Sequence, residues 1–257
     1  YQDKMLLGHA PQPQFWRAPT DNDFGNRMGI LCNVWRTAGQ NKEFKGMNVE
    51  RKDGAVTLTS IYYLRDVASD YTVKYTVYAD GRVEVNGSWK AGNIALPEIP
   101  RFGMQMTLAQ EFDQFSWYGR GPWENYSDRN TASFIGKYTS TVDEQYVAYI
   151  RPQENGNKTD VRWLTLTNKE GFGLRIDGLQ PLSVSALRNY PEDFDAGLTK
   201  SQRHINDINP RKAVVLHVDL AQRGVGGDNS WGMYPHEPYL LKAKEYTYGY
   251  VISPVAK

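Results

Sequence analysis

Cysteine is the scarcest residue of chemical consequence in this chain: Cys32 is the only one in 257 residues. With a single thiol, no disulfide can form within the chain and no thiolate cluster can bind a metal ion. Cys32 lies in the largely apolar run 30–34 (ILCNV), which favours a small buried side chain over a reactive thiol. A single cysteine is compatible with either the cytoplasm or the periplasm.

An excess of charge of one sign is also lacking. Lys and Arg total 30 and Asp and Glu total 29, which gives a net charge of +1, and there is no polybasic run. This balance argues against nucleic acid as a partner, because a phosphate backbone must be neutralised by clustered basic side chains. No stretch approaches the roughly 20 apolar residues of a membrane span, so we expect no membrane partner. Residues 1–10 show no signal-peptide pattern, and because Tyr1 replaces an initiator Met we expect a fragment of a longer protein.

Metal-binding patterns are missing as well. The four histidines His9, His204, His217 and His236 are scattered, with no HxH or HExxH spacing. We therefore expect no metal ion and no cofactor in this chain. His217 lies within the alternating run 215–219 (VLHVD), which favours a hydrogen-bonded histidine in a sheet over a functional one.

Strand signals, in contrast, are abundant. Aromatic residues make up 13% of the chain, with Gly 23 and Pro 13 available for turns. Residues 71–78 and 82–89 alternate with period two around Asp80-Gly81, a strong hairpin signal because both turn residues tolerate positive φ. Other predicted strands cover residues 103–108, 113–118, 161–167, 172–176, 182–187, 213–220 and 246–252.

Helices are predicted to be few and short. Apolar residues between 30 and 38 recur at helical spacing, and residues 192–203 could form a second helix after Pro191. We find no repeat or linker, so the pattern predicts one all-β domain over residues 1–257, a sandwich or barrel with one or two short helices. Long segments without regular structure, which are often functional in compact domains, are expected around residues 10–27, 120–130 and 222–238.

Polar side chains gather in four loop segments. They are residues 15–23 (FWRAPTDND), 117–129 (WYGRGPWENYSDR), 151–157 (RPQENGN) and 226–231 (GGDNSW). Arginines, carboxylates and amides can hydrogen-bond sugar hydroxyls while aromatic rings stack on apolar sugar faces, although arginine–carboxylate pairs also close loops. The residues that could line a sugar cleft or fix loops are Arg17, Asp21, Asn22, Arg120, Glu124, Arg151, Glu154, Asn155 and His217.

These segments, with the second read as 119–129 (GRGPWENYSDR) and the third as 149–156 (YIRPQENG), resemble four signatures of the last domain of family 2 β-galactosidases. They occur in the family's order and extend over almost the whole chain. The resemblance implies a galactose-mutarotase-like super-sandwich of mostly antiparallel strands. It also implies a setting, the last domain or separate small subunit of an enzyme that hydrolyses terminal β-D-galactosides such as lactose.

The resemblance further implies which domain binds the aglycone sugar and which domain carries catalysis. Trp231 matches the tryptophan that reaches the neighbouring barrel's active site and stacks on the aglycone sugar, and Asp228 and Asn229 share its substrate-binding loop. In the family both catalytic glutamates and the magnesium ligands lie in that α/β barrel, and no series of βα units occurs here. We therefore expect no catalytic residue in this chain. The parent enzyme would be a retaining glycosidase, whose two closely spaced carboxylates would lie upstream.

The expected partners are the upstream domains, a galactoside or aglycone sugar, and further copies in a homo-oligomeric full enzyme. Glu124 and Glu154 are expected to pair with Arg120, Arg129 or Arg151 and to fix loops. Two alternatives remain open at this point. One is an aldose 1-epimerase, in which His217 and either glutamate would be the acid and base. The other is a stand-alone carbohydrate-binding module with Trp16, Trp123 or Trp231 as its exposed platform.

Overall fold

The computed structural model describes residues 1, 3–199, 203–229 and 231–256. Its strands form one curled sheet in which every pairing is antiparallel. The order is β1-β6-β11-β10-β12-β5-β4-β3-β2, and β9, β7 and β8 continue from the other side of β10. The strands are β1 (His9–Gln14), β2 (Lys42–Lys52), β3 (Ala55–Leu64), β4 (Ser69–Tyr78), β5 (Val83–Trp89), β6 (Arg101–Ala109), β7 (Gln114–Gly121), β8 (Phe134–Thr141), β9 (Lys158–Thr167), β10 (Gly173–Leu187), β11 (Ala213–Gln222) and β12 (Tyr246–Val255).

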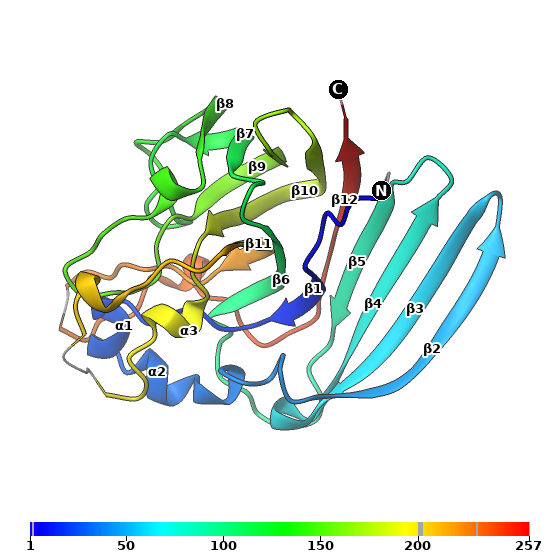
Figure 1. Ribbon diagram of the computed structural model, residues 1–257. Coiled ribbons are helices and arrows are strands. Elements are labelled where there is room, and N and C mark those ends of the chain that lie inside the picture. The colour runs from blue at the N-terminus through cyan, green and yellow to red at the C-terminus, as the bar shows by residue number, and fades with distance from the viewer. Residues whose placement is uncertain (2, 200–202, 230, 257) are drawn as a thin grey trace.

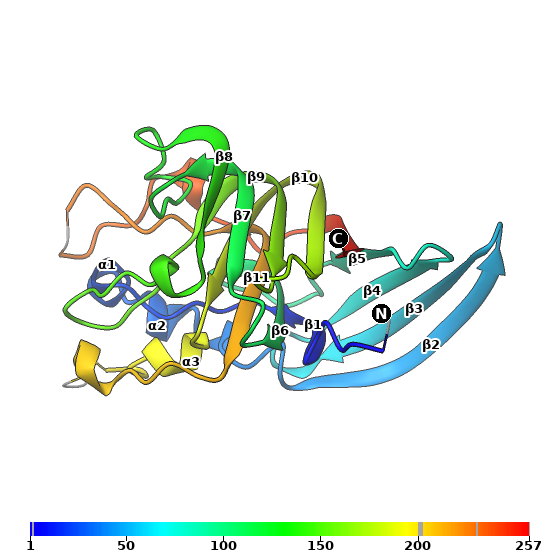
Figure 2. The same ribbon diagram turned by 45° about the horizontal axis from the view of Figure 1, so that its top comes forward.

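Helices occupy little of the described chain. The α-helices are α1 (Asp21–Gly25), α2 (Met28–Leu31) and α3 (Pro191–Phe194), and short 3-10 turns include η1 (Asn33–Trp35). The three α-helices lie together at one end of the molecule, and β2 to β5 extend from the opposite end as a projecting wing (Figures 1 and 2). The predicted all-β class with mostly antiparallel strands and short helices is therefore confirmed. No helix of the described residues is long and apolar enough to cross a membrane.

The predicted hairpin around Asp80-Gly81 is confirmed as β4 and β5, with Val77 opposite Val83. Of the two turn residues, Gly81 has a positive φ, of 87°. The same Asp-Gly signal joins β2 to β3, where Asp53 and Gly54 both have positive φ, but this hairpin was not predicted. Strands β1 and β8 were not predicted either.

Two predicted boundaries are wrong. The strands predicted at 172–176 and 182–187 are joined in a single long strand, β10, which begins at Gly173; its first half pairs with β12 and its second half with β11. The helix predicted at 192–203 is limited to α3, and residues 200–202 lie outside the described residues. Gly197 has a φ of 86°, which a right-handed helix cannot continue through, and Arg203 donates to the carbonyl oxygens of Asp193 and Asp195.

Aromatic side chains fill the core between the curled halves of the sheet. Trp35 of η1 packs edge-on against Trp89 of β5 with ring centroids 5.4 Å apart, so the helical segment predicted at 30–38 covers the sheet through its tryptophan. Cys32 is buried beside it, and this burial raises the pKa of the thiol to about 12. The expectation that Cys32 is a buried side chain is confirmed.

Candidate functional site

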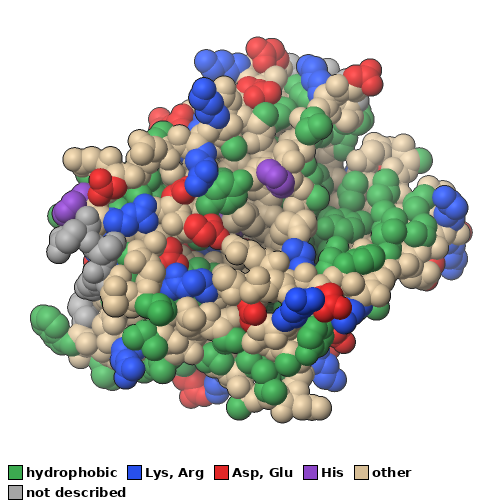
Figure 3. All heavy atoms as spheres, turned by 60° about the horizontal axis from the view of Figure 1, so that its bottom comes forward, with side chains coloured by type: hydrophobic (Ala, Val, Ile, Leu, Met, Phe, Trp, Pro, Cys, Tyr) green, Lys and Arg blue, Asp and Glu red, His purple; other side chains and the backbone are tan. Residues whose placement is uncertain are grey.

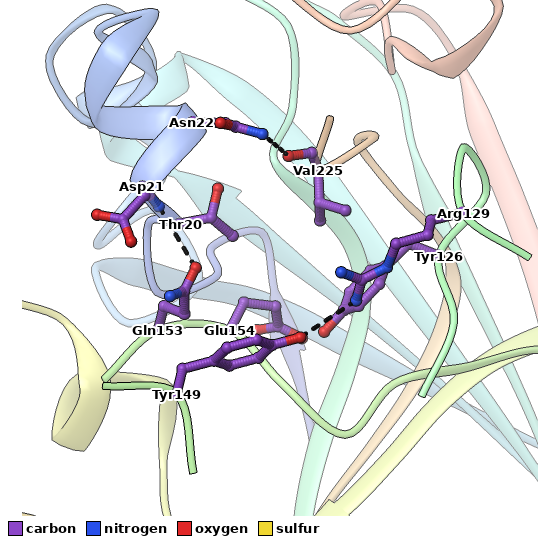
Figure 4. Close-up of a pocket in the computed structure, with 9 residues that line it drawn as sticks. All are labelled: Thr20, Asp21, Asn22, Tyr126, Arg129, Tyr149, Gln153, Glu154 and Val225. Atoms are coloured by element: carbon purple, nitrogen blue, oxygen red, sulfur yellow. Dashed lines mark hydrogen bonds between the residues drawn. The ribbon is translucent and has the colours of Figure 1, made fainter. Parts of the chain in front are cut away.

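Three of the four polar segments found in the sequence, together with Val225 directly before the fourth, line one small pocket of about 120 Å³ (Figure 4). It lies among the loop that leads into α1, the loop after β7, the loop before β9 and the segment after β11. Segments up to 205 residues apart in sequence are thus brought to one place by the sheet. The lining residues are Thr20, Asp21, Asn22, Tyr126, Arg129, Tyr149, Gln153, Glu154 and Val225.

A buried ion network fixes the loop after β11 to α1. The Asp23 carboxylate lies 2.9 Å from both the Arg17 and the Arg223 guanidinium, and all three side chains are fully buried. Arg17 also donates to the carbonyl oxygens of Arg223 and Gly224. Asp23 in turn caps α1 by accepting from the backbone N–H of Thr20. Arg17 is therefore part of the scaffold, below the pocket surface.

A second buried network centres on Arg101 of β6. Its guanidinium contacts Glu154 at 2.8 Å, Asp219 at 3.3 Å and Nδ1 of His217 at 2.8 Å. Burial, assisted by the Arg101 charge, lowers the pKa of His217 well below its ordinary value, so the imidazole is neutral and its Nδ1 accepts the hydrogen bond. Burial raises the pKa of Asp219 to about 8, with the Arg101 charge acting in the opposite direction. Glu154 is the member of this network that reaches the pocket.

One wall of the pocket carries a hydroxyl without a partner. Arg129 donates to Glu124 at 2.6 Å and to the Tyr149 hydroxyl at 3.3 Å, and Glu124 also accepts from the Gly156 N–H at 2.7 Å and from Tyr149. The Tyr126 ring is buried, and its hydroxyl has no hydrogen-bond partner among the described residues. That hydroxyl lies at the pocket beside Tyr149 and Glu154 (Figure 4). The polar groups of this wall are therefore either bonded to one another or, like the Tyr126 hydroxyl, buried.

The loop that carries Trp231 is fixed at its base and open at its tip. Asp128 accepts from the Gly226 N–H at 2.7 Å, and Asn22 donates to the Val225 carbonyl at 3.0 Å. Farther along, Asn229 accepts from the Trp231 N–H at 2.9 Å, while Asp228 pairs with His236. The Trp231 side chain is 86% exposed. Residue 230 of this loop lies outside the described residues.

The remaining predicted residues act in loop structure. Arg120 pairs with Asp160 at 2.6 Å and donates to the Ser133 carbonyl. Arg151 pairs with Asp21 at 2.7 Å. Asn155 accepts from the Val147 N–H and donates to the Gln153 carbonyl.

The expected pairing of the two glutamates is half right. Glu124 pairs with Arg129, which was among the expected arginines, but the partner of Glu154 is Arg101. Trp16 is buried and its indole donates to Asp195 at 2.8 Å, so it cannot be an exposed platform, whereas Trp123 is 71% exposed.

Several site residues were not selected from the sequence. Tyr126 and Arg129 stand within a segment that was identified, and Tyr149 begins the third one. No local sequence pattern indicated that Arg101 and Arg223 would be buried, because an arginine at a strand end is usually exposed. Only the assembled sheet buries these two side chains. Both glutamates near the pocket are held by arginines, which suits positioning better than proton transfer. Within the described residues, no group of three or more His, Cys, Asp or Glu is placed to hold a metal ion.

The family model and the relatives found by sequence comparison all indicate β-galactosidases. A family model described as β-galactosidase small chain matches residues 1–252. A β-galactosidase of Priestia megaterium is 38% identical over 256 residues, which are 99% of this chain and 24% of the relative. One of Streptococcus thermophilus is 31% identical, over 99% of this chain and 25% of the relative. The chain thus spans about a quarter of the length of the curated relatives it matches.

Similar solved structures include a galactose mutarotase related enzyme from Lactobacillus acidophilus, with a TM-score of 0.43 and 11% identity over 82% of this chain and 72% of that one. A GH36 α-galactosidase from Geobacillus stearothermophilus aligns with a TM-score of 0.45 and 12% identity, over 83% of this chain and 28% of that one.

Proposed function

The chain belongs to the β-galactosidase small-chain family, and from this premise we propose that it is the non-catalytic domain that completes the active-site cleft of a larger β-galactosidase. The parent enzyme would be a retaining glycosidase that hydrolyses terminal β-D-galactosides such as lactose. Its two catalytic carboxylates would lie in an upstream barrel. The contribution of this chain would be the aglycone subsite, formed by Trp231 with Asp228 and Asn229.

The exposure of Trp231 on an anchored loop carries the proposal. A tryptophan that is 86% exposed leaves a large apolar ring in water, which is unfavourable unless another surface or a ligand covers it. The base of its loop is tied to Asp128 and Asn22, and Arg17 holds the preceding carbonyl groups. The ring is thereby presented outward from a rigid support, as a residue that acts in a neighbouring domain's cleft requires.

The other expectations follow as parts of this proposal. Magnesium would be bound in the upstream barrel, as the family resemblance implies. The complete enzyme would be a homo-oligomer. The arginine–carboxylate pairs near the pocket would keep the loops in place.

The test is Trp231→Ala in the longer β-galactosidase. We expect weaker binding of a glucose acceptor and less transglycosylation, by about fivefold, because a lost stacking contact amounts to about 1 kcal/mol. Inhibition by galactose, which would occupy the other subsite, should change little. Both are measured from acceptor kinetics and galactose inhibition constants.

Trp123→Ala is the matched control, because Trp123 is likewise an exposed tryptophan but belongs to a different loop. It should leave the acceptor kinetics unchanged. Equal acceptor kinetics for wild type and Trp231→Ala would refute the aglycone role.

A further inference from the structure

The wing formed by β2 to β5 has two chemically different faces. The strand register places Val49 of β2 opposite Leu58 of β3, Leu58 opposite Tyr75 of β4, and Tyr75 opposite Val85 of β5. Side chains in one cross-strand row share a face, and alternate rows repeat it. The same face therefore carries a second mostly apolar row, made of Met47, Ser60, Val73 and Gly87, and a third of Phe44, Tyr62, Tyr71 and Trp89. A fourth row on this face holds Arg51, Val56, Val77 and Val83. The opposite face carries the rows of Asn48, Thr59, Lys74 and Asn86 and of Glu50, Thr57, Thr76 and Glu84.

Burial of the apolar face decreases from the body of the molecule toward the free edge. Val85 and Trp89 on β5 and Tyr71 on β4 are buried in the main core. On β3 the side chains of this face are mostly half-buried. On β2, Phe44 is 57% exposed and Met47 is 55% exposed. A face that belongs to the core at β5 is thus left open at β2.

The open region is continuous and large on the scale of the wing. Hydrophobic side chains gather on the wing, which projects at the right of the space-filling view (Figure 3). The ribbon views show that no other described element packs over the outer half of the wing (Figures 1 and 2). Contiguous exposed apolar surface of this kind marks an interaction site.

The face, rather than the edge, is the surface available for an interaction. β2 is an edge strand, and its charged residues Lys45, Glu50, Arg51 and Lys52 oppose the addition of another strand. The apolar side chains of Met47 and Val49 can be covered by a layer packed face to face.

We propose that the outer apolar face of the wing, made of Phe44, Met47, Val49, Val56, Leu58 and Val77, is a docking surface for another part of the same longer polypeptide. This inference rests on the proposed function, which makes the chain one part of a larger β-galactosidase. The matched relatives are about four times as long as the region they share with this chain, so most of such a polypeptide lies elsewhere. A covalently joined partner has a high effective concentration and is favoured over a second copy.

The position of Tyr1 agrees with this occupant. A Cβ atom on Gly81, at the turn between β4 and β5, would lie 3.5 Å from the Tyr1 ring and 3.5 Å from Pro254. Polypeptide joined at Tyr1 would therefore start beside the wing.

Cysteine labelling distinguishes the covered face from the exposed one. Met47→Cys and Asn48→Cys are made separately in this chain and in the longer protein, and each is reacted with a polar maleimide. Adjacent strand residues point to opposite faces, so Asn48→Cys is the matched control for Met47→Cys. The native Cys32 gives little background, because it is buried with a raised pKa. Val49→Cys and Glu50→Cys repeat the comparison if the first pair fails to fold.

In this chain alone we expect both cysteines to react at similar rates. In the longer protein we expect Met47→Cys to react at least tenfold more slowly, while Asn48→Cys is unaffected. Equal rates in the longer protein would overturn the proposal. Protection of Met47→Cys in this chain that rises with protein concentration, together with a dimer in sedimentation, would overturn it in favour of a second copy. Labelling does not depend on hydrolysis. The proposed function is therefore judged separately, by the galactosidase activity of the same longer protein.

Discussion

Buried charges hold the loops around the pocket in one arrangement. Arg17, Asp23 and Arg223 are fully buried, so each charge depends on its partners for the interactions that water would otherwise supply. Two arginines share one carboxylate, and Glu98 gives Arg223 a second acceptor at 2.9 Å. The network joins the loop before α1 to the segment that leads to Trp231. The segment that leads to the exposed Trp231 is therefore held by a salt-bridge network that is inaccessible to solvent.

Asp23→Asn should destabilise the chain by about 3–5 kcal/mol, because it leaves two buried guanidinium groups without their shared carboxylate. Chemical denaturation monitored by tryptophan fluorescence measures this loss. Asp80→Asn is the control, since Asp80 also pairs with an arginine, Arg82 at 2.7 Å, but on the surface, and its loss should be much smaller. Similar losses for the two variants would show that burial of the network contributes little.

At the scale of elements, the sheet depends on close approach between particular strands. Gly103 of β6 lies opposite Asp219 of β11 in the register. A Cβ atom on residue 103 would lie only 2.6 Å from the Cα atom of Asp219. The absence of a side chain at this position lets β6 bring Arg101 to the buried carboxylates of Glu154 and Asp219.

Gly103→Ala is expected to destabilise the chain by about 3 kcal/mol, because the overlap involves backbone that cannot move without separating two strands. Gly54→Ala provides the comparison. Its φ of 76° is unfavourable for alanine by about 1–2 kcal/mol, yet no atom lies within 4 Å of the added Cβ. Thermal or denaturant unfolding should show a lower stability for Gly103→Ala than for Gly54→Ala. The reverse order of stability would contradict the steric argument.

At the scale of the whole molecule, the described residues form a scaffold with two outward-facing features. One is the Trp231 loop, and the other is the open apolar face of the wing. The pocket near the base of the Trp231 loop is small, and its carboxylates Asp21 and Glu154 are paired with arginines. This arrangement agrees with the proposed role of a domain that contributes surfaces to a larger enzyme.

This chain alone should not hydrolyse a nitrophenyl β-galactoside, since Glu124 and Glu154 are both held in ion pairs within the loops. Release of nitrophenol by the purified chain, compared with the longer protein as positive control, measures this. Sustained turnover by the isolated chain would reject the non-catalytic assignment. Polarimetry on fresh α-galactose tests the epimerase alternative in the same preparation, and accelerated mutarotation would favour it. We expect none, because His217 is buried and already bonded to Arg101.

Local patterns predicted the elements whose signals are local. The period-two runs and Asp80-Gly81 gave the β4–β5 hairpin, and the same reasoning applied to Asp53-Gly54 would have given β2 and β3. The helix expected at 192–203 failed because Gly197 takes a left-handed conformation, which the sequence pattern did not indicate. Around the pocket, the expected pair of Glu124 and Arg129 forms, but the partner of Glu154 is Arg101, which lies outside the polar segments.

The sequence by itself determined the all-β class, the buried single cysteine and the segments that carry the polar residues, because alternation, turn residues and motifs depend on neighbours along the chain. Only the tertiary structure decided which segments meet and which side chains are buried. Arg17 and Trp231 both stand in recognisable motifs, yet one is fully buried and the other almost fully exposed. Their opposite surroundings arise from strands and loops distant in sequence, whose packing no local pattern specifies.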